Sequence, residues 1–349
     1  MASHFAAARE ILQQAIADRA FPAAAIEVGN SHQPLWRETF GRLTFDPDSP
    51  LTRDDTVFDL ASLTKVLATT TLVMQQVERG ILSLDDPVAH HVPDWRDKGS
   101  VVVTIRDLLS HTAGLVAHVP IYRDQRGRDA FEAAILHSPR EYEPRSKSVY
   151  SDLGFMLLGF ILDRIAPLAT QFDRLRVHMG NIQDLQFMPP AIWTPRTAPT
   201  RLDPWRQRLL VGEVDDDNAW ALGGTAGHAG LFGVVGSVGE FARHVMQVLE
   251  GRTGAFAQTT AETFIARRTE IPDSSRALGW DTMLPTSSCG TRMSPRAFGH
   301  VGFTGTSLWI DPERSIYVTL LTNRVHPTPD NNAIARIRPA LHDAIIDGV

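Results

Sequence analysis

The residues best suited to chemistry are Ser62 and Lys65, within the stretch FDLASLTK at residues 58–65. Residues 66–79 are apolar at helical spacing, and Gly80 stands where a helix would end. If this helix begins at or just before Ser62, the serine and the lysine share one face of its first turn. A helix N-terminus offers N–H groups and partial positive charge to whatever Ser62 attacks. An amine held on a half-buried face can lose its proton and serve as the base.

The use of lysine in the whole chain strengthens this interpretation. Of 34 basic residues only Lys65, Lys98 and Lys147 are lysines, and the other 31 are arginines, which proteins cannot deprotonate. Trp95 and Pro144 stand three residues before the other two lysines, so the chain has one S-x-x-K sequence. The alternative is a capped helix that carries an exposed polar pair with no chemical role.

Composition and charge narrow the class of protein. The 349 residues are enough for one large domain or two coupled lobes, and 43% hydrophobic with 21% charged residues is typical of globular proteins. The net charge is −6 and no basic run occurs, so we do not expect nucleic acid as a partner. The single cysteine, Cys289, excludes an intrachain disulfide, is expected to be an inert filler, and suits a reducing compartment.

Targeting and membrane signals are weak. Residues 1–20 have the pattern of an amphipathic helix, without the uninterrupted apolar run of a signal peptide. The longest apolar run, residues 153–162, is about half of a membrane span. We therefore expect no membrane-spanning helix and a cytoplasmic location.

Strand patterns occur at both ends of the chain. Residues 23–29 and 34–40 predict a hairpin around the turn 30–33, and residues 307–310 and 316–321 predict another around 311–314. A short strand is expected at 298–302 and a helix at 331–347. A further helix, capped by Ser237, is expected to run to about residue 250.

Between residue 80 and about residue 204 the patterns are mostly helical. Helices are expected near 84–87, at 104–109 and at 151–165, while five prolines in 188–204 indicate an extended surface connection. The glycine-dense stretch 223–230 requires tight turns or close approach of its backbone to another group.

These elements predict an α+β fold in which one antiparallel sheet is built from both termini and flanked by helices. We expect a sheet-containing lobe from residues 1–80 and 231–349. A mostly helical lobe, residues 81–230, would be inserted into it. The active site would lie at the junction, where clefts usually form.

Two further clusters accompany Ser62 and Lys65: Tyr150-Ser151-Asp152, and His300-Val301-Gly302 followed by FTGT. Together they resemble the serine β-lactamase and penicillin-binding protein superfamily, whose motifs are S-x-x-K, Y-x-N or S-x-N, and K-T-G or H-x-G, in that order. The stretches LSHTAGL at 109–115 and GHAGLF at 227–232 resemble the class C-related branch of esterases, peptidases and muropeptide amidases. The resemblance covers residues 20–345 and implies the β-lactamase/transpeptidase-like fold.

The resemblance also implies a mechanism that needs no metal or cofactor. Ser62 would attack a carbonyl carbon and form an acyl-enzyme, which water would hydrolyse. Lys65, with its pKa lowered by burial and a nearby cation, would take or relay the Ser62 proton. Tyr150 would share that proton and pass it to the leaving group. The backbone N–H groups of Ser62 and Phe303 would form the oxyanion hole.

Two departures from the family pattern bear on the substrate. Asp152 replaces an asparagine, and an ionised carboxylate only accepts hydrogen bonds, so it would fix Lys65 or prefer a cationic substrate group. His300 replaces a lysine, which removes a fixed positive charge at neutral pH, and Val301 lacks the usual hydroxyl. We expect an ester, peptide or amide substrate, a muropeptide among the candidates, rather than efficient β-lactam hydrolysis. The expected substrate-binding residues are Asp152, His300, Gly302 and His228.

Other interpretations remain open at this point. The same departures also suit a binder or sensor of cell-wall fragments that does not turn over. His90-His91 is expected in a surface loop rather than a metal site. His111 and His228 are expected to bond buried loop carbonyls, although His228 also suits the pocket wall. Residues 215–217, three aspartates, are expected in a solvated turn, with a substrate contact or a divalent cation as the alternative.

Overall fold

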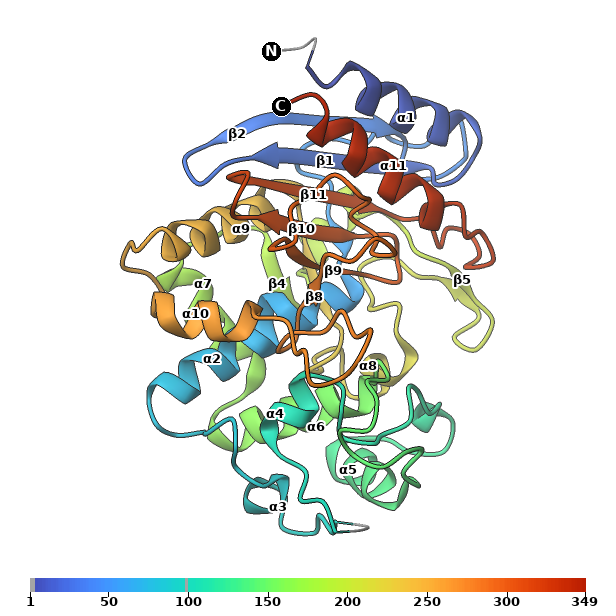
Figure 1. Cartoon of the computed structure of the whole chain (residues 1–349). Coiled ribbons are helices and arrows are strands. Elements are labelled where there is room, and N and C mark those ends of the chain that lie inside the picture. Colours follow the sequence, from blue (N-terminus) through green and yellow to red (C-terminus); the bar gives the residue numbers. More distant parts are fainter. Residues whose placement is uncertain (1–3, 98–99) are drawn as a thin grey trace.

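Both ends of the chain contribute strands to one antiparallel sheet in the computed structural model, which describes residues 4–97 and 100–349 (Figure 1). The strand order is β2-β1-β11-β10-β9-β8. β1 (Ala23–Gly29) lies between β2 (Pro34–Gly41) and β11 (Ile316–Thr322). The first strand of the chain therefore pairs with the last one inside the sheet. The remaining strands are β10 (Ser307–Asp311), β9 (Phe298–Val301) and β8 (Asp281–Thr282). The predicted antiparallel sheet and both predicted hairpins are confirmed.

Turn residues explain where the hairpins reverse. The Asn30 carboxamide oxygen accepts the N–H groups of His32 and Gln33, which closes the β1–β2 turn. Asp311, fully buried at the end of β10, accepts from the N–H groups of Glu313 and Arg314. Short polar side chains that bond their own backbone are typical of such reversals, and here they set the register of the strands that follow.

Helices cover both faces of the sheet, which accounts for the burial of every residue in β1, β10 and β11. α1 (Ala6–Ala17) and α11 (Ile334–Ile346) pack against each other over one face, and α9 (Val235–Leu249) packs on the other (Figure 1). α9 begins three residues earlier than predicted, because Val234 rather than Ser237 is its N-cap residue. Ser237 lies inside it, and its hydroxyl donates to the carbonyl of Gln183 rather than capping the helix.

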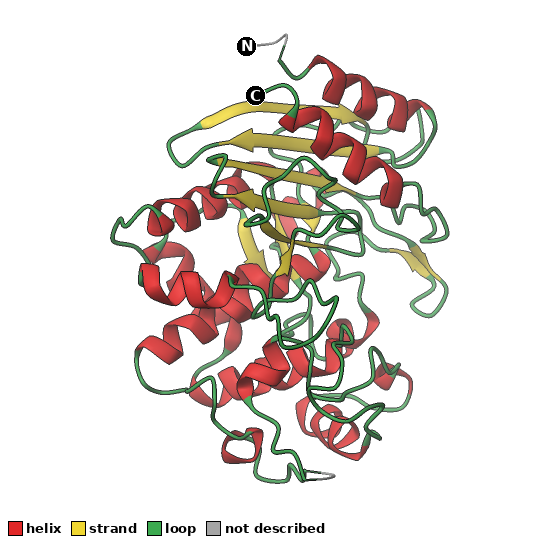
Figure 2. Cartoon of the chain, in the orientation of Figure 1, coloured by secondary structure: helices red, strands yellow, loops and turns green. Residues whose placement is uncertain are grey.

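The middle of the chain is mostly helical, as predicted, and occupies the side of the molecule away from α1 and α11 (Figure 2). Its helices are α3 (Val88–His91), α4 (Ile105–Leu109), α5 (Arg128–His137), α6 (Asp152–Ile165), α7 (Leu168–His178) and α8 (Asp217–Ala221). The helices α2 (Thr71–Glu78) and α10 (Gln258–Ile265) precede and follow this part of the chain.

Short strands join this helical part to the sheet side. β3 (Phe58–Asp59), β7 (Leu231–Gly233) and β4 (Leu185–Phe187) form a three-stranded sheet beside the serine, and β5 (Leu202–Asp203) pairs with β6 (Arg208–Leu209). The proline-rich connection is therefore more structured than expected, since it also contains a 3-10 turn at Ala191–Arg196. One hydrophobic cluster extends from β1 through α2 and α6 to β11. The division at residues 80 and 230 stays a prediction.

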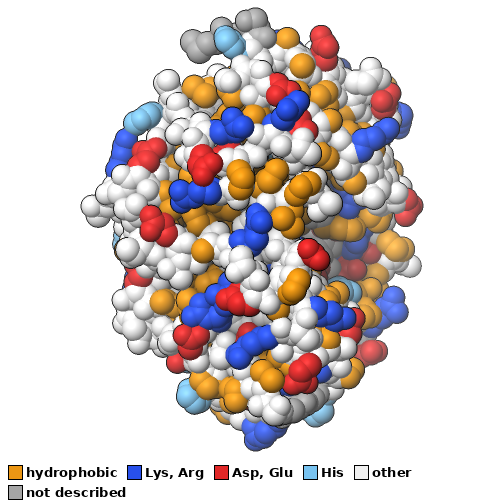
Figure 3. All heavy atoms as spheres, in the orientation of Figure 1, with side chains coloured by type: hydrophobic (Ala, Val, Ile, Leu, Met, Phe, Trp, Pro, Cys, Tyr) orange, Lys and Arg blue, Asp and Glu red, His pale blue; other side chains and the backbone are white. Residues whose placement is uncertain are grey.

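Within the described residues, no single helix is both long and apolar enough to cross a membrane. α6 and α7 pass that test only as a pair with an 83° bend between them, and most of α6 is buried in the core. On the face drawn in Figure 3, acidic and basic side chains are interspersed rather than gathered by sign.

Candidate active site

Ser62 lies in an irregular turn rather than at the start of a straight α-helix. Residues Ala61–Leu63 form a 3-10 turn, Lys65–Thr70 follow in a π-helical stretch, and α2 begins only at Thr71. Ala61 has φ +47°, a left-handed conformation that is costly for a residue with a side chain and that surrounding contacts must maintain. The predicted helix is present, but its first turns are wound differently. Such departures are common at functional sites.

Lys65 is fully buried and makes three hydrogen bonds. Its Nζ atom lies 2.8 Å from Ser62 Oγ, 2.8 Å from Asp152 Oδ1 and 3.2 Å from the carbonyl oxygen of His228. An ammonium has three N–H donors, so these acceptors satisfy the charged form completely. Ser62 and Lys65, predicted to be neighbours, are within hydrogen-bonding distance.

The protonation state of Lys65 differs from the expectation. Burial lowers its pKa, but the charge of Asp152 and the phenol of Tyr150 outweigh burial, so the pKa of Lys65 is raised. The prediction of a lowered pKa was wrong because the distance from Lys65 to the Asp152 carboxylate cannot be read from the sequence. In the resting site Lys65 is an ammonium ion.

Asp152 is the first residue of α6, where the helix N-terminus favours an anion. Burial raises its pKa, but the charge of Lys65 and a hydrogen bond from His118 dominate and hold it well below the usual range. The second carboxylate oxygen lies 3.5 Å from His118 Nδ1, and this contact raises the pKa of His118. Asp152 thus fixes Lys65, one of the two expected roles, while its contact with a substrate stays a prediction.

Tyr150 lies over the same ammonium. Its ring centre is 4.8 Å from Lys65 Nζ, and it packs against the rings of His111 at 4.7 Å and His300 at 5.8 Å. His111 accepts a hydrogen bond from the N–H of Ser151, and burial keeps the pKa of His111 well below its usual value. His111 thus bonds an N–H rather than the carbonyl expected, and as a neutral ring it holds the Tyr150 segment in place.

The strand β9 leads into the loop that carries Gly302 and Phe303. A Cβ atom on Gly302 would stand 2.6 Å from the Leu60 carbonyl oxygen, so only glycine allows this loop to approach the serine turn so closely. Phe303 and Ser62 line the same cavity. Among the described residues, neither the Ser62 N–H nor the Phe303 N–H donates a hydrogen bond to a protein group, so both are available to a ligand in this cavity.

His300 is buried with its Nδ1 atom 2.8 Å from the Val301 carbonyl. Burial, Lys65 and Arg276 together put the pKa of His300 well below its usual value, so the ring is neutral, as expected from the sequence. Arginine side chains from other parts of the chain nevertheless place positive charge near His300. A cavity of about 420 Å³ beside Ser62, Tyr150 and His300 is also lined by Arg276, Arg324 and Arg338.

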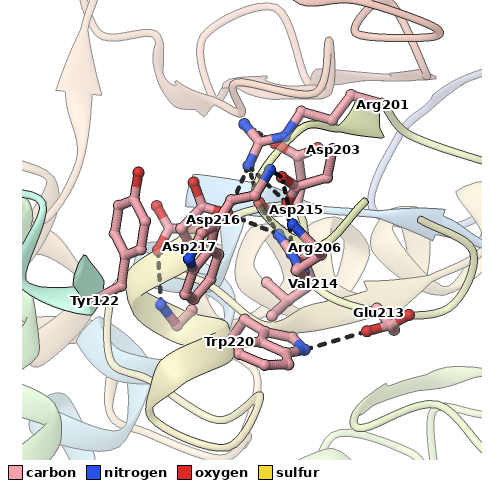
Figure 4. Close-up of polar contacts among 12 residues, drawn as sticks. Tyr122, Arg201, Asp203, Arg206, Glu213, Val214, Asp215, Asp216, Asp217 and Trp220 are labelled. Carbon is pink, nitrogen blue, oxygen red and sulfur yellow. Dashed lines mark hydrogen bonds and ion pairs between the residues drawn. The ribbon is translucent and has the colours of Figure 1, made fainter. Parts of the chain in front are cut away.

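A second cavity, of about 550 Å³, is also lined by Ser62, Tyr150 and Phe303. Asp152, His118, Arg201 and the three aspartates 215–217 complete this part of its wall. The expectation of a solvated turn at 215–217 was wrong. Asp215 is buried, and Arg201 and Arg206 converge on the segment, bonding the Asp215 carbonyl and the Asp217 carboxylate (Figure 4).

The side chain of His228 lines neither of the two cavities beside Ser62. Its ring is buried, and Nε2 lies 2.9 Å from Asp216 Oδ1, while its carbonyl oxygen is the group that contacts Lys65. This placement differs from the expected substrate contact of the side chain.

The side chains at the site that the sequence motifs did not indicate include His118, Arg276 and Asp59. His118 and Arg276 lie in stretches with no motif, and nothing in sequence spacing links them to Ser62. Asp59 stands three residues before Ser62 and is buried beneath it. Its signal was a carboxylate in an otherwise apolar stretch, FDLAS.

The remaining candidates take no part in the site. His90 and His91 lie in the last turn of α3 rather than in the expected loop, and His91 pairs with Asp86. No group of three His, Cys, Asp or Glu side chains among residues 4–97 and 100–349 is arranged to hold a metal. Cys289 is buried, and burial raises the pKa of its thiol to about 12. It is therefore inert, as predicted.

Solved structures share this fold. EstCE1, a hydrolase with promiscuous acyltransferase activity, superposes with a TM-score of 0.78 at 20% identity and covers 97% of both chains. Unliganded simvastatin synthase (LovD) from Aspergillus terreus gives 0.74 at 19% identity, covering 99% of this chain and 98% of that one. The octameric penicillin-binding protein homologue from Pyrococcus abyssi gives 0.73 at 18%, covering 94% and 75%. At these identities the likeness concerns the fold alone.

Comparison of the amino-acid sequence identifies relatives and the family. A protein of Salmonella agona (strain SL483), named putative D-alanyl-D-alanine carboxypeptidase, is 32% identical over 316 residues, covering 79% of this chain and 71% of the relative. The relative of Salmonella gallinarum with the same name is 32% identical over 312 residues, covering 78% and 70%. The Beta-lactamase family profile matches residues 8–342. The resemblance drawn from the three motifs is confirmed, and the chain belongs to the Beta-lactamase family of serine hydrolases.

Proposed function

We propose that this hydrolase cleaves an amide or ester bond through an acyl-Ser62 intermediate, and that its substrates are peptide-like molecules with a carboxylate on the leaving group. The observation that carries the proposal is the 2.8 Å contact between Lys65 Nζ and Ser62 Oγ on the wall of a cavity. Such a contact is the usual arrangement of an activated nucleophile with its base.

In the proposed acylation, Ser62 Oγ attacks the carbonyl carbon of the substrate and loses its proton to the Lys65–Tyr150 pair. Because Lys65 is charged at rest, this pair must first release one proton. The pair then gives the serine proton to the leaving nitrogen or oxygen as that bond breaks. In deacylation, water attacks the ester and gives its proton to the same pair, which returns it to Ser62.

Charge on the carbonyl oxygen would be stabilised by the N–H groups of Ser62 and Phe303, which make no other hydrogen bond in the described part of the chain. Removing one such donor costs about 3–4 kcal/mol of transition-state stabilisation in other hydrolases. The tight Gly302 turn holds the Phe303 N–H in its place.

The leaving-group side is proposed to accept a carboxylate. Arg276 lies 5.1 Å from the ring centre of Tyr150 and has no ion-pair partner among the described residues, so its charge is available to a ligand in the 420 Å³ cavity. The names of the Salmonella relatives, carboxypeptidases of D-alanyl-D-alanine, support a peptide that ends in a carboxylate. Efficient β-lactam hydrolysis is not proposed, because Asp152 replaces the asparagine of the family motif and Val301 lacks the usual hydroxyl.

A binder or sensor that acylates without turnover is the second candidate. The observation that favours it is the charged state of Lys65, which slows removal of the Ser62 proton at neutral pH. Steady release of product from a p-nitrophenyl ester, at many equivalents per protein, would exclude this candidate. A single burst of one equivalent would support it.

The test of the proposal is covalent labelling of Ser62. Treatment with a fluorophosphonate should add one adduct to the peptide that contains Ser62, and Ser62→Ala should take none and lose hydrolysis of all substrates. A panel of D-amino-acid peptides, their C-terminal amides, muropeptides and short esters, compared by kcat/KM, then assigns the substrate class. Cytoplasmic location stays part of the proposal, suits the lone Cys289, and is tested by fractionation of cells that express the full-length protein.

A further inference from the structure

The carboxylate of Asp59 accepts a hydrogen bond from the backbone of the turn that carries Ser62. Asp59, which is 2% exposed, accepts the Ala61 N–H at 2.8 Å with Oδ1 and the Asp215 N–H at 2.6 Å with Oδ2. Ala61, the residue before the serine, is the one with φ +47°. The bond to Ala61 therefore maintains the unfavourable conformation that directs Ser62 into the cavity.

The backbone of Asp59 is tied to the loop of the proposed oxyanion hole. Thr304 Oγ1 donates to the Asp59 carbonyl at 2.7 Å, and Thr306 Oγ1 donates to the Leu60 carbonyl at 3.0 Å. Thr304 directly follows Phe303. The same residue thus touches the serine turn, the Phe303 loop and the Asp215 wall.

The third partner of Asp59 is the far wall of the larger cavity. Asp215 gives its N–H to Asp59, and its carbonyl accepts from Arg201 and Arg206, which also bind the Asp217 carboxylate (Figure 4). The Asp59 carboxylate therefore links this wall directly to the backbone of the serine turn.

We infer that Asp59 is a positioning residue, which fixes Ser62 relative to both the Phe303 N–H and the 215–217 wall of the substrate cavity. Asp59 touches no reacting atom, and the inference rests on the proposed acyl-Ser62 chemistry. It explains why a buried carboxylate is kept in an apolar stretch: two N–H groups that point from different directions need two acceptor oxygens. An asparagine offers only one.

The electrostatics of Asp59 supply an independent signature. Burial, and then the charge of Asp215, raise its pKa to about 7, with Asp216 adding to the same effect. Arg201 and Arg324 balance the charge of Asp215 from the other side. Since the unfolded pKa is near 3.8, the folded protein binds a proton more tightly, and Asp59 makes stability fall as pH rises from about 4 to about 7.

The experiment compares Asp59→Asn with Asp311→Asn, which alters another buried carboxylate that caps backbone N–H groups, at the far end of β10 from Thr306. For Asp59→Asn we expect the rate of acyl-enzyme formation to fall about 10–100-fold, as a small misplacement of the nucleophile would cause, with the KM of a short ester changed by less than about threefold. The melting temperature of Asp59→Asn, taken relative to wild type at each pH, should rise between pH 4 and 7, because the variant lacks the carboxyl whose proton the folded protein binds more tightly. Asp311→Asn should melt lower at every pH but acylate at the wild-type rate.

An acylation rate of Asp59→Asn within threefold of wild type would overturn the inference, and so would an equal loss in both variants. If Asp59→Asn does not fold, Thr304→Val removes one bond of the same cluster with little change of shape, and an unchanged acylation rate there overturns the inference. Failure of the wild-type protein to form any acyl-enzyme would instead refute the proposed function.

Discussion

Lys65 is bonded to Asp152 as closely as to Ser62: both oxygens lie 2.8 Å from its Nζ atom. This carboxylate occupies a position where penicillin-recognising relatives have an amide, and its charge makes Lys65 an ammonium ion in the resting protein. In the proposed mechanism this cluster therefore has to release a proton before Ser62 is activated, and the pH dependence of turnover should report that step.

Asp152→Asn should move the pH dependence of acylation. Without the anion, burial dominates and lowers the pKa of Lys65, so the rising limb of the rate against pH should shift to lower pH by at least about one unit, equivalent to about 1.4 kcal/mol. The variant should also be less stable by about 3–5 kcal/mol, because its buried lysine loses its partner. Single-turnover rates and urea denaturation measure the two effects. A limb that stays in place would show that Asp152 does not control the base.

Tyr150→Phe removes the proposed proton carrier while keeping the ring that packs on His111 and His300. We expect kcat to fall about 10²–10⁴-fold, the usual contribution of a positioned acid–base group, with a nearly unchanged KM. Tyr317→Phe is the control, because its hydroxyl bonds Glu27 in the sheet away from the cavities. That variant should lose stability and keep its kcat. A Tyr150→Phe enzyme with more than about half of wild-type kcat would remove Tyr150 from the mechanism.

Gly302→Ala should impair catalysis through crowding. The added methyl would stand 2.1 Å from Thr306 Oγ1 as well as close to the Leu60 carbonyl, so the Phe303 loop must move away from the serine turn. We expect a loss of kcat of about 10²–10³-fold, as for removal of an oxyanion-hole donor. Gly154→Ala in α6 makes only ordinary contacts, at 3.5 Å or more, and should be fully active. Equal activity of both variants would contradict the proposed role of the loop.

Arg276→Ala should separate substrates by their leaving group. For peptides with a free C-terminal carboxylate we expect kcat/KM to fall about 10–100-fold, the loss of a charge-assisted hydrogen bond of about 1.5–3 kcal/mol. The corresponding amides and neutral esters should be affected less than about threefold. Arg292→Ala, which removes an exposed surface cation paired with Asp347, is the matched control. A uniform loss over all substrates would argue against a carboxylate site at Arg276.

The sequence predicted the parts of this protein that local patterns determine. Alternating strands around Asn30 and Asp311 specified both hairpins, and the order of S-x-x-K, Tyr150 and His300-Val301-Gly302 specified the family. Local pattern also placed Ser62 and Lys65 on one turn, because three-residue spacing does so in any helical winding.

What the sequence did not predict depends on distances across the fold. The pKa of Lys65 changed direction because Asp152, 87 residues away in the chain, lies within 2.8 Å. The aspartates 215–217 have the composition of a surface turn, and contacts with Arg201 and Arg206 make them part of the cavity wall, with Asp215 buried. Arg276 reaches the cavity from the segment between α10 and β8, which carries no motif at all.

The most direct test of the account is mass spectrometry of the acyl-enzyme during turnover. When wild-type protein is mixed with an activated ester and quenched within the first turnover, the peptide containing Ser62 should carry the acyl group, and the adduct should disappear once substrate is consumed. Ser62→Ala should form no adduct and release no product. Product release by Ser62→Ala at the wild-type rate, or an acyl group on any other residue, would contradict the account.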